Sequence, residues 1–367
     1  MYHAFGFWYV VINWYQLPQE RGNMRRSSYL LAITFCLSLL PAVQAKASKP
    51  LEIYFIDVEG GQATLIVDPH GSSLLVDTGW PGFDNRDAGR IVSAAHAAGV
   101  KKLDYVLITH YHLDHVGGVV QLAQQIHIGA FVDHGPNQED SSRQLYADYQ
   151  KAISQRKHLV LKPGERLPFK DIVVQTLTAA GEHIGDPLPG ANQPNPVCAS
   201  ELEAEADGTE NARSLGILVS YGEFRFIDLG DLTKRKEREL VCPNNLVGTV
   251  DLYLTTHHGL FQSNDQAIVR ALHPRVAIMN NGPHKGGSKE AWETVHSSPG
   301  LEDLWQLHYA LDSDKDHNVT EEFIANPLES CEGKYIKVTA GEDGSFTVVN
   351  SRNGFSKRYS KSASAHK

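Results

Sequence analysis

The sequence predicts an α+β protein in which two β-sheets pack face to face and helices cover the outside. Short apolar runs rich in β-branched residues, separated by glycine-containing turns, begin at residue 51 and return after residue 214. Each group of strands is followed by segments in which apolar residues recur at helical spacing. Because strands followed by helices occur twice along the chain, two sheets with outer helices fit the order best.

The first group of strands is expected at residues 51–58, 63–67 and 73–76. Helical spacing follows at 88–98 and ends at Gly99, a residue type that commonly terminates helices. The remaining elements of this half are strands at 103–109, 128–133 and 172–178, and helices at 116–126 and 145–156.

The second half contains a long polar loop, a second group of strands and further helices. Residues 185–208 are rich in glycine, proline and acidic residues, and we expect a surface loop bordering the site. The main domain is expected to span residues 46–312. Residues 313–367 are expected to form an extension with a hairpin at 335–349 and a disordered basic tail at 356–367. The other predicted elements are strands at 215–221, 224–229, 252–255 and 276–280, and helices at 264–271 and 290–296.

The N-terminal region has the pattern of a targeting segment. Residues 24–45 combine a basic start, a short apolar run and small residues before a cleavage site after Ala45, which predicts a secretory signal peptide. A membrane anchor is the alternative, but the run is short for a bilayer and contains polar residues. Residues 1–23 are expected to be a start-site artefact. The mature protein is therefore expected to be periplasmic or secreted, without membrane association.

Composition and charge restrict the function classes. Hydrophobic residues make up 41% and charged residues 21%, which is ordinary for a globular protein. The net charge of -9 argues against a general polyanion-binding surface, but it does not exclude a local basic cleft. Three cysteines remain after cleavage, so at most one intrachain disulfide forms in an oxidising compartment. Cys198 and Cys242 are one candidate pair, with Cys331 left as a thiol.

The most informative segment is residues 109–118, Thr-His-Tyr-His-Leu-Asp-His-Val-Gly-Gly. It places four ligand-type side chains within six positions, between an expected strand and an expected helix. Residues two apart on an extended segment point the same way, so His110 and His112 can share one metal ion. Asp114 and His115 then face a second ion from the start of the helix. Imidazole and carboxylate ligands suit zinc, and also manganese, iron or cobalt.

The spacing His-x-His-x-Asp-His resembles the signature of the metallo-β-lactamase superfamily. The chain is similar above all to the soluble metallo-β-lactamase domain of ComEC-type DNA-uptake proteins. The resemblance implies a four-layer αββα sandwich and a hydrolase that uses two divalent metal ions, zinc in the first place. The segments that carry it lie at residues 55–67, 75–79, 109–118, 211–215, 229–231 and 256–259.

The resemblance also implies further metal ligands. Asp231 matches a Gly-Asp motif at a strand end and is expected to bridge the two ions, in preference to Asp228 within the strand. At the next strand end, His257 is expected to bind the second ion, and His258 is expected either to support the ligands or to face substrate as a catalytic residue. The third histidine of the first ion has no matching motif. His183 is its candidate by position, with an ordinary loop histidine as the alternative reading.

Other polar residues are expected to support these ligands. Asp77, in Leu-Val-Asp-Thr-Gly, is expected to accept the outer N–H of a ligand imidazole, and Asp57 to support the same neighbourhood. Asn211 and Ser214 match an Asn-x-x-Ser motif and are expected to fix a loop. His134, at a strand end, is expected to face substrate or to have a structural role. A glycine-rich loop is expected to be solvated, although its side chains could reach substrate: Asn281, His284 and Lys285.

The expected chemistry is hydrolysis by a hydroxide that two metal ions share, while one ion polarises the substrate oxygen. Asp114 is expected to orient the nucleophile and to relay a proton. Because of the resemblance, a phosphodiester or phosphate ester is the leading substrate, with nucleic acid as a partner only in that capacity. The alternatives are a β-lactam or lactone hydrolase and a non-catalytic metal-binding protein. The sequence does not indicate an oligomeric state.

Overall fold

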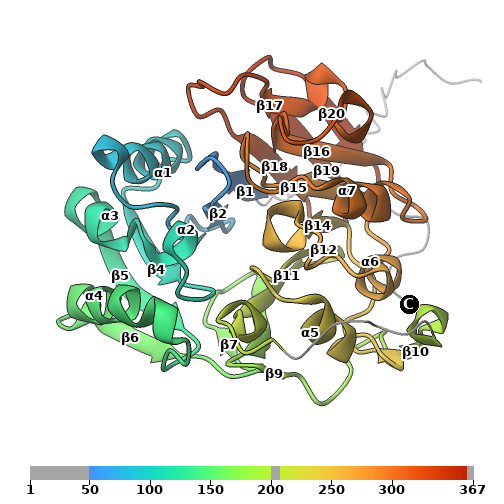
Figure 1. Cartoon of the computed structure of the whole chain (residues 1–367), viewed down its shortest axis with the longest axis horizontal. Helices are drawn as coiled ribbons and strands as arrows, with labels where there is room; N and C mark the ends of the chain where they lie inside the picture. The colour runs from blue at the N-terminus through green and yellow to red at the C-terminus, as the bar shows by residue number, and fades with distance from the viewer. Residues whose placement is uncertain (1–48, 200–206, 362–367) are drawn as a thin grey trace, which may run out of the picture. The chain divides into compact units, whose positions relative to one another are not determined.

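The computed structural model describes residues 49–199 and 207–361. The expected start-site segment and signal peptide lie outside the described residues, as does the end of the expected basic tail. In the described part of the chain, none of the helices is both long and apolar enough to cross a bilayer. Two nine-stranded sheets form the centre of this part (Figure 1).

The first sheet contains the N-terminal strands and the C-terminal ones. Its order is β20-β19-β18-β1-β2-β3-β4-β5-β6. β1, β2 and β3 are antiparallel neighbours, whereas β3 to β6 run parallel and are joined through helices. The bounds are β1 Leu51–Phe55, β2 Thr64–Val67, β3 Ser73–Val76, α1 Arg86–Ala97, β4 Lys102–Leu107, α2 Leu113–Val116, α3 Val119–Gln125, β5 His127–Asp133, α4 Arg143–Ile153, β6 Lys157–Val160, β18 Ile336–Ala340, β19 Phe346–Asn350 and β20 Ser356–Tyr359.

The second sheet has the order β17-β16-β15-β14-β12-β11-β8-β7, and β9 pairs with β8. Its strands from β12 to β17 run parallel, again with helices between them. The bounds are β7 Arg166–Leu167, β8 Val173–Ala179, β9 Glu182–His183, β11 Gly216–Tyr221, β12 Phe224–Asp228, α5 Lys234–Glu239, β14 Leu252–Leu254, α6 Gln266–Leu272, β15 Val276–Met279, α7 Lys289–His296, β16 Asp303–His308 and β17 Ile324–Asn326.

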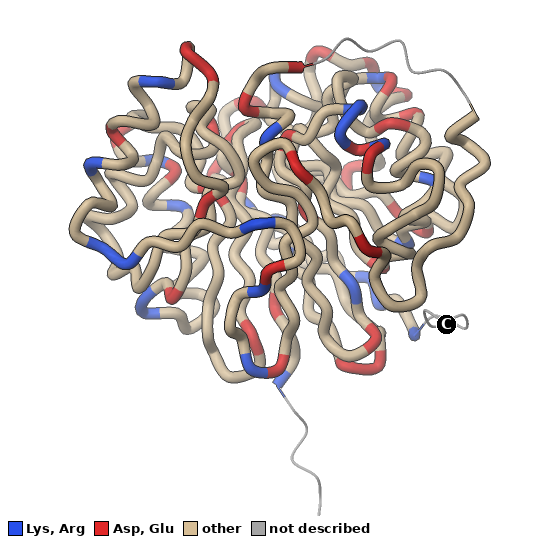
Figure 2. Tube along the Cα trace, turned by 90° about the horizontal axis from the view of Figure 1, so that it is seen from below, with Lys and Arg blue, Asp and Glu red and all other residues tan. Residues whose placement is uncertain are grey.

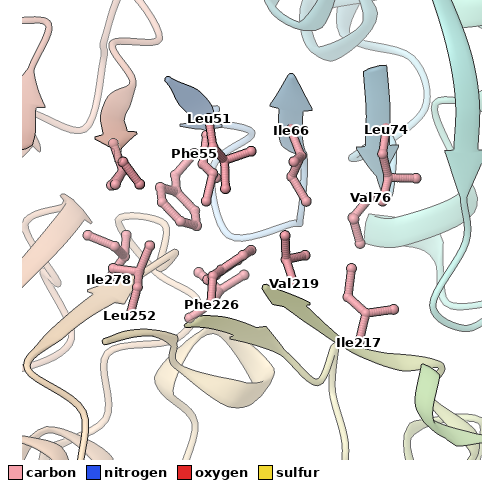
Figure 3. Packing of buried hydrophobic residues seen from close by; sticks show 14 of the residues in the cluster. Leu51, Phe55, Ile66, Leu74, Val76, Ile217, Val219, Phe226, Leu252 and Ile278 are labelled. Atoms are coloured by element: carbon pink, nitrogen blue, oxygen red, sulfur yellow. The ribbon is translucent and has the colours of Figure 1, made fainter. Parts of the chain in front are cut away.

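Apolar layers hold these elements together. The central layer lies between the sheets, and Figure 3 shows side chains from both sheets pointing into it. The rings of Phe55 in β1 and Phe226 in β12 meet edge to face with centroids 5.6 Å apart. Further apolar layers bury α1, α3 and α4 against the first sheet, and α6 and α7 against the second. The four-layer αββα sandwich predicted from the sequence is confirmed.

The helix expected at residues 116–126 is interrupted, because the chain passes very close to a neighbouring loop. α2 ends at Val116 and α3 begins at Val119. A Cβ at Gly117 would overlap the ring of Pro81, and one at Gly118 would overlap the carbonyl oxygen of Thr78. Two consecutive glycines therefore let the metal-binding segment lie directly against the loop after β3.

The C-terminal extension is part of the main sandwich, so the expected boundary at residue 312 is wrong. The expected hairpin is confirmed as β18 and β19, but β18 pairs with β1 and completes the first sheet. The tail is ordered at its start, because β20 pairs with β19 and buries Tyr359. The ring of Tyr359 stacks on Phe346 at 4.8 Å, and its hydroxyl accepts a hydrogen bond from Nε1 of Trp305 at 3.1 Å.

The long polar loop is tied to the second half of the chain. Cys198 and Cys242 form a disulfide, which confirms the candidate pair, and Cys331 is the free cysteine among the described residues. In the same region β10 (Gln193–Pro194) pairs with β13 (Asn244–Asn245). The disulfide and this small sheet fix the loop to the segment that follows α5.

Candidate metal centre

The predicted ligands lie where strands of the two sheets end. His110 and His112 follow β4, and Asp114 and His115 lie in α2. Asp231 follows β12 of the second sheet, beyond the tight turn at Gly230, where a Cβ would overlap Thr109. The carboxyl ends of parallel strands thus bring residues from both sheets to one place.

Four buried side chains converge there: Asp114, His115, Asp231 and His258. The Nε2 atom of His115 lies 3.1 Å from Oδ2 of Asp114 and 3.2 Å from Oδ2 of Asp231. The Nε2 atom of His258 lies 3.1 Å from Oδ2 of Asp114 and 3.3 Å from Oδ1 of Asp231. The two Nε2 atoms are 3.2 Å apart. One donor atom from each of the four residues lies within 4.8 Å of the others. Imidazole and carboxylate donors gathered this closely fit one divalent ion.

Two more imidazoles, those of His110 and His112, lie beside this group of four, and His110 approaches Asp231. The Nε2 atom of His110 lies 3.8 Å from Oδ2 of Asp231. That nitrogen is buried and has no hydrogen-bond partner within the described part of the chain. The ring of His112 lies against the ring of His110, with centroids 4.6 Å apart. A buried imidazole nitrogen without a partner is costly unless something binds it, so His110 and His112 fit the first of the two expected ion sites.

The electrostatics of the cluster differ from donor to donor. Burial opposes ionisation of Asp231, but the neighbouring His115, His257 and His258 hold the pKa of that carboxyl well below its usual range. Burial, reinforced by the charge of His115, lowers the pKa of His110 well below its usual value. An ionised Asp231 and a neutral His110 are the protonation states that metal binding requires. Burial opposes a charge on His115, but Asp231, Asp114 and Asp77 raise the pKa of that ring well above its usual value, so an ion bound there takes the place of a proton.

The structure changes the expected roles of His257 and His258. They lie in the turn Thr256–Gly259, where both residues have left-handed backbone with φ of 54° and 55°. Neighbouring side chains therefore do not alternate as they would beyond a straight strand. His258 has the ligand geometry that we expected of His257, whereas Nε2 of His257 lies 3.3 Å from Oδ2 of Asp231 and its side chain is slightly exposed. Burial, opposed by Asp231, lowers the pKa of His257 to about 4, so its ring is neutral at physiological pH.

Two of the expected supporting residues contact the ligands directly. Oδ2 of Asp77 lies 2.7 Å from Nδ1 of His115. The backbone N–H of Asp231 donates to Oγ of Ser214 at 3.2 Å, and the backbone N–H of Ser214 donates to the carbonyl of Asn211 at 3.1 Å. The Asn-x-x-Ser turn thus orients the segment that carries the predicted bridging carboxylate.

Two histidines that the sequence placed near the centre have other contacts. Nδ1 of His183 donates to the carbonyl oxygen of Ile184 at 2.7 Å, in the short β8–β9 hairpin, and none of its contacts among the described residues reaches the cluster. His183 therefore does not lie with the other predicted ligands. Nε2 of His134 bonds to Oε2 of Glu210 at 2.9 Å, which agrees with the structural role that was one of its two expected roles.

In the described part of the chain, the side chain of Asp57 bonds to residues other than the predicted metal ligands. Among the described residues it forms a separate group with His308 and Cys331. Its Oδ1 lies 2.8 Å from Nε2 of His308, and its Oδ2 accepts a hydrogen bond from Nη1 of Arg90 at 2.9 Å. The guanidinium of Arg90 balances the charge of this carboxylate. The chain turns after Asp57, and it is the backbone N–H of Gln62 that reaches Asp114, at 3.1 Å from its carbonyl oxygen.

Two contacts to the predicted metal ligands were not expected from the sequence, although Lys285 is among the loop residues that could reach substrate. Nζ of Lys285 forms an ion pair with Oδ2 of Asp114 and lies 5.2 Å from the centre of the Trp80 ring. Nε2 of His112 lies 3.0 Å from Oε2 of Glu139. Local spacing could not show either contact, because both join segments that are far apart in the sequence.

Comparison with known proteins agrees with the geometry. A family model described as the metallo-beta-lactamase superfamily matches residues 56–196, which include the His-x-His-x-Asp-His segment. Residues 56–196 of the chain are thus similar to the metallo-β-lactamase superfamily, and the His and Asp donors described above fit divalent metal ions.

The curated relatives are much longer than this chain. ComE operon protein 3 of Bacillus subtilis (strain 168) is 22% identical over 267 residues, which cover 68% of this chain and 30% of that protein. Recombination protein 2 of Haemophilus influenzae is 24% identical over 286 residues, which cover 76% of this chain and 30% of that protein. The chain thus spans about 30% of the length of each.

Solved structures with a similar trace are distant in sequence. The metallo-beta-lactamase fold protein YhfI from Bacillus subtilis has a TM-score of 0.43 at 13% identity, covering 70% of this chain and 95% of that one. A putative metal-dependent hydrolase from Parabacteroides distasonis has a TM-score of 0.39 at 15% identity, covering 70% and 93%.

Proposed function

We propose that this chain is an exported hydrolase that holds two divalent metal ions and cleaves phosphodiesters or phosphate esters. The observation that carries the proposal is the place of Asp231. Its Oδ2 lies 3.2 Å from Nε2 of His115, 3.3 Å from Nε2 of His257 and 3.8 Å from Nε2 of His110. A pair of ions that share a ligand requires one carboxylate that faces the imidazoles of both ion sites. Asp231 has this position.

When bound, the ions supply a water that is acidic at neutral pH and positive charge for the substrate oxygen. The residues of the chain supply orientation and proton transfer. Oδ2 of Asp114 points into the cluster, where it is placed to orient the attacking water and to accept its proton. His257 lies beside Asp231 on the more exposed side of the turn, and we propose that it faces the substrate.

Two observations support a phosphate ester as the substrate. Lys285 places a cation next to Asp114, and the oxygens of a phosphate ester carry the negative charge that a lysine binds. One relative is named a recombination protein, and recombination is a reaction of DNA. The net charge is -9, and Figure 2 shows acidic and basic positions interspersed along the trace. We therefore propose that recognition is local to the metal centre rather than spread over a basic surface.

A substrate panel tests the proposal. The mature, metal-loaded chain would be assayed on single-stranded DNA, a chromogenic phosphodiester, a chromogenic phosphomonoester, a β-lactam and a lactone. We expect turnover of a phosphate substrate that is lost in Asp231→Ala. The control is Asp228→Asn, since Asp228 is equally buried but bonds to Gln62 rather than to a metal ligand. Turnover of the β-lactam or the lactone alone would contradict the proposal.

We also propose that the chain acts outside the cytoplasm after cleavage following Ala45. The disulfide between Cys198 and Cys242 supports this, because such bonds persist in oxidising compartments. N-terminal sequencing of protein recovered from the periplasm or the medium should begin at Lys46. A mature form that retains residues 24–45 would contradict export by signal cleavage.

A further inference from the structure

Two imidazoles of the metal centre, those of His110 and His115, are held in the same way. Nδ1 of His110 lies 3.0 Å from Oγ of Thr109, which leaves Nε2 for the cluster. Nδ1 of His115 lies 2.7 Å from Oδ2 of Asp77, which again leaves Nε2 free. In each ring an oxygen on one side fixes which nitrogen carries the proton, and the other nitrogen is available to a metal.

His112 follows the same design with its nitrogens exchanged. Its Nε2 lies 3.0 Å from Oε2 of Glu139. Among the described residues no hydrogen bond involves its Nδ1, which is therefore the nitrogen available to a metal ion. The ring lies against that of His110, whose Nε2 is buried without a partner.

Resting on the proposed two-ion function, we propose that Glu139 is a positioning residue: its carboxylate holds His112 so that Nδ1 faces the first ion. Glu139 contributes the charge and the hydrogen-bond acceptor that an outer carboxylate provides to a ligand histidine. The other contacts of its carboxylate are to protein donors, as an outer carboxylate requires. Oε2 accepts a hydrogen bond from the backbone N–H of Glu210 at 2.7 Å, and Oε1 accepts one from the hydroxyl of Ser141.

The loop that contains Glu139 is hydrogen-bonded to residues 210–214, the segment in which Ser214 contacts Asp231. Glu210 is fully buried, and its carboxylate bonds to Nε2 of His134 at 2.9 Å and to the backbone N–H of Gln138 at 3.0 Å. Four residues after Glu210, Ser214 accepts the backbone N–H of Asp231. Residues 210–214 thus orient His112 through Glu139 and the shared carboxylate through Ser214. This gives His134 a role as part of the structure that holds the first ion site.

The test uses the full mature chain stripped of metal and titrated with Zn²⁺, and with Co²⁺ for a visible spectrum. Glu139→Ala should weaken one of two ions by roughly 10- to 100-fold and leave the other unchanged. Glu139→Gln should have a smaller effect, because an amide oxygen still accepts the N–H of His112. The matched control is Asp140→Asn, since Asp140 is the adjacent carboxylate and its side chain is 90% exposed.

The outcomes separate this inference from the proposed function. Two equally tight ions in Glu139→Ala would overturn the positioning role and leave the two-ion function standing. Equal losses in the Ala and Gln variants would also overturn it, because a ligand, unlike a positioning residue, is not rescued by an amide. A wild-type chain that binds no metal would refute the proposed function itself. Thermal unfolding of the metal-free variants verifies that each is folded.

Discussion

The carboxylate of Asp77 lies 2.7 Å from Nδ1 of His115, across the ends of neighbouring strands β3 and β4. The same carboxylate accepts the backbone N–H of Thr109 at 2.8 Å and its hydroxyl at 2.7 Å. One buried acid therefore fixes both the start of the metal-binding segment and the tautomer of a ligand. A sequence motif on one strand thereby determines the chemistry of a residue 38 positions further along.

Asp77→Asn should weaken one metal ion by roughly 10- to 100-fold, because the neutral amide holds His115 less firmly. Asparagine tolerates the left-handed backbone at this position (φ 61°), so the substitution itself adds little strain. Isothermal titration of the metal-free variant measures the change. Asp57→Asn is the control, because Asp57 is equally buried but bonds to His308 and Arg90. A similar loss of affinity in both variants would mean that the effect is on stability alone.

His258→Ala should lose more metal than His257→Ala. The Nε2 atom of His258 lies within 3.3 Å of two carboxylates and of a second imidazole, whereas that of His257 approaches Asp231 alone. His257→Ala should instead lower turnover while retaining most of the metal. Metal content after dialysis and steady-state kinetics measure the two effects. The opposite order would restore the roles that the resemblance implied.

His183→Ala should leave the affinity for both ions unchanged. Its ring bonds to the carbonyl oxygen of Ile184 in the β8–β9 hairpin, away from the cluster. A competition assay with a chromophoric chelator measures both affinities, and His110→Ala provides the positive control. A selective loss of one ion in His183→Ala would show that the hairpin moves toward the centre when metal binds.

Glu237 should make the fold less stable as pH rises. It is fully buried in α5, where it accepts the backbone N–H groups of Asn264 at 2.9 Å and Asp265 at 2.8 Å. Burial raises its pKa from 4.5 to about 7. The folded state therefore keeps a proton that the unfolded chain releases, so this contribution is complete below pH 4.5 and is lost as pH rises through about 7.

A shift of this size corresponds to about 3 kcal/mol of unfolding free energy. Urea unfolding at about pH 5 and about pH 8 should show a steeper fall in stability for the wild type than for Glu237→Gln. Glu239→Gln, in the same helix but with a partly exposed side chain paired to Lys236, should behave as the wild type. Parallel pH profiles for all three proteins would exclude an ionisable Glu237 as the cause.

Local patterns in the sequence predicted most of the strands and helices of the fold. The six positions from His110 to His115 predicted the ligand segment, because a strand end followed by a helix restricts where those side chains point. Apolar periodicity located most strands and helices. The charged helix α5, Lys-Arg-Lys-Glu-Arg-Glu, has no apolar spacing and was missed.

Local sequence patterns could not predict contacts between segments that lie far apart in the chain. Lys285 meets Asp114 across 171 positions, and Glu139 meets His112 across 27. His257 and His258 both have left-handed backbone, and such a turn changes which of the two side chains points into the cluster. The added strands β18 to β20 complete the first sheet only because the chain returns to β1 after more than 280 positions.

The metal content of the mature chain tests the central claim most directly. Elemental analysis of protein reconstituted with Zn²⁺ and freed of excess metal should give two ions per chain, and fewer than two for Asp231→Ala. Asp228→Asn should retain both. A wild-type protein that holds no ion after reconstitution, or an Asp231→Ala variant that still holds two, would contradict the account.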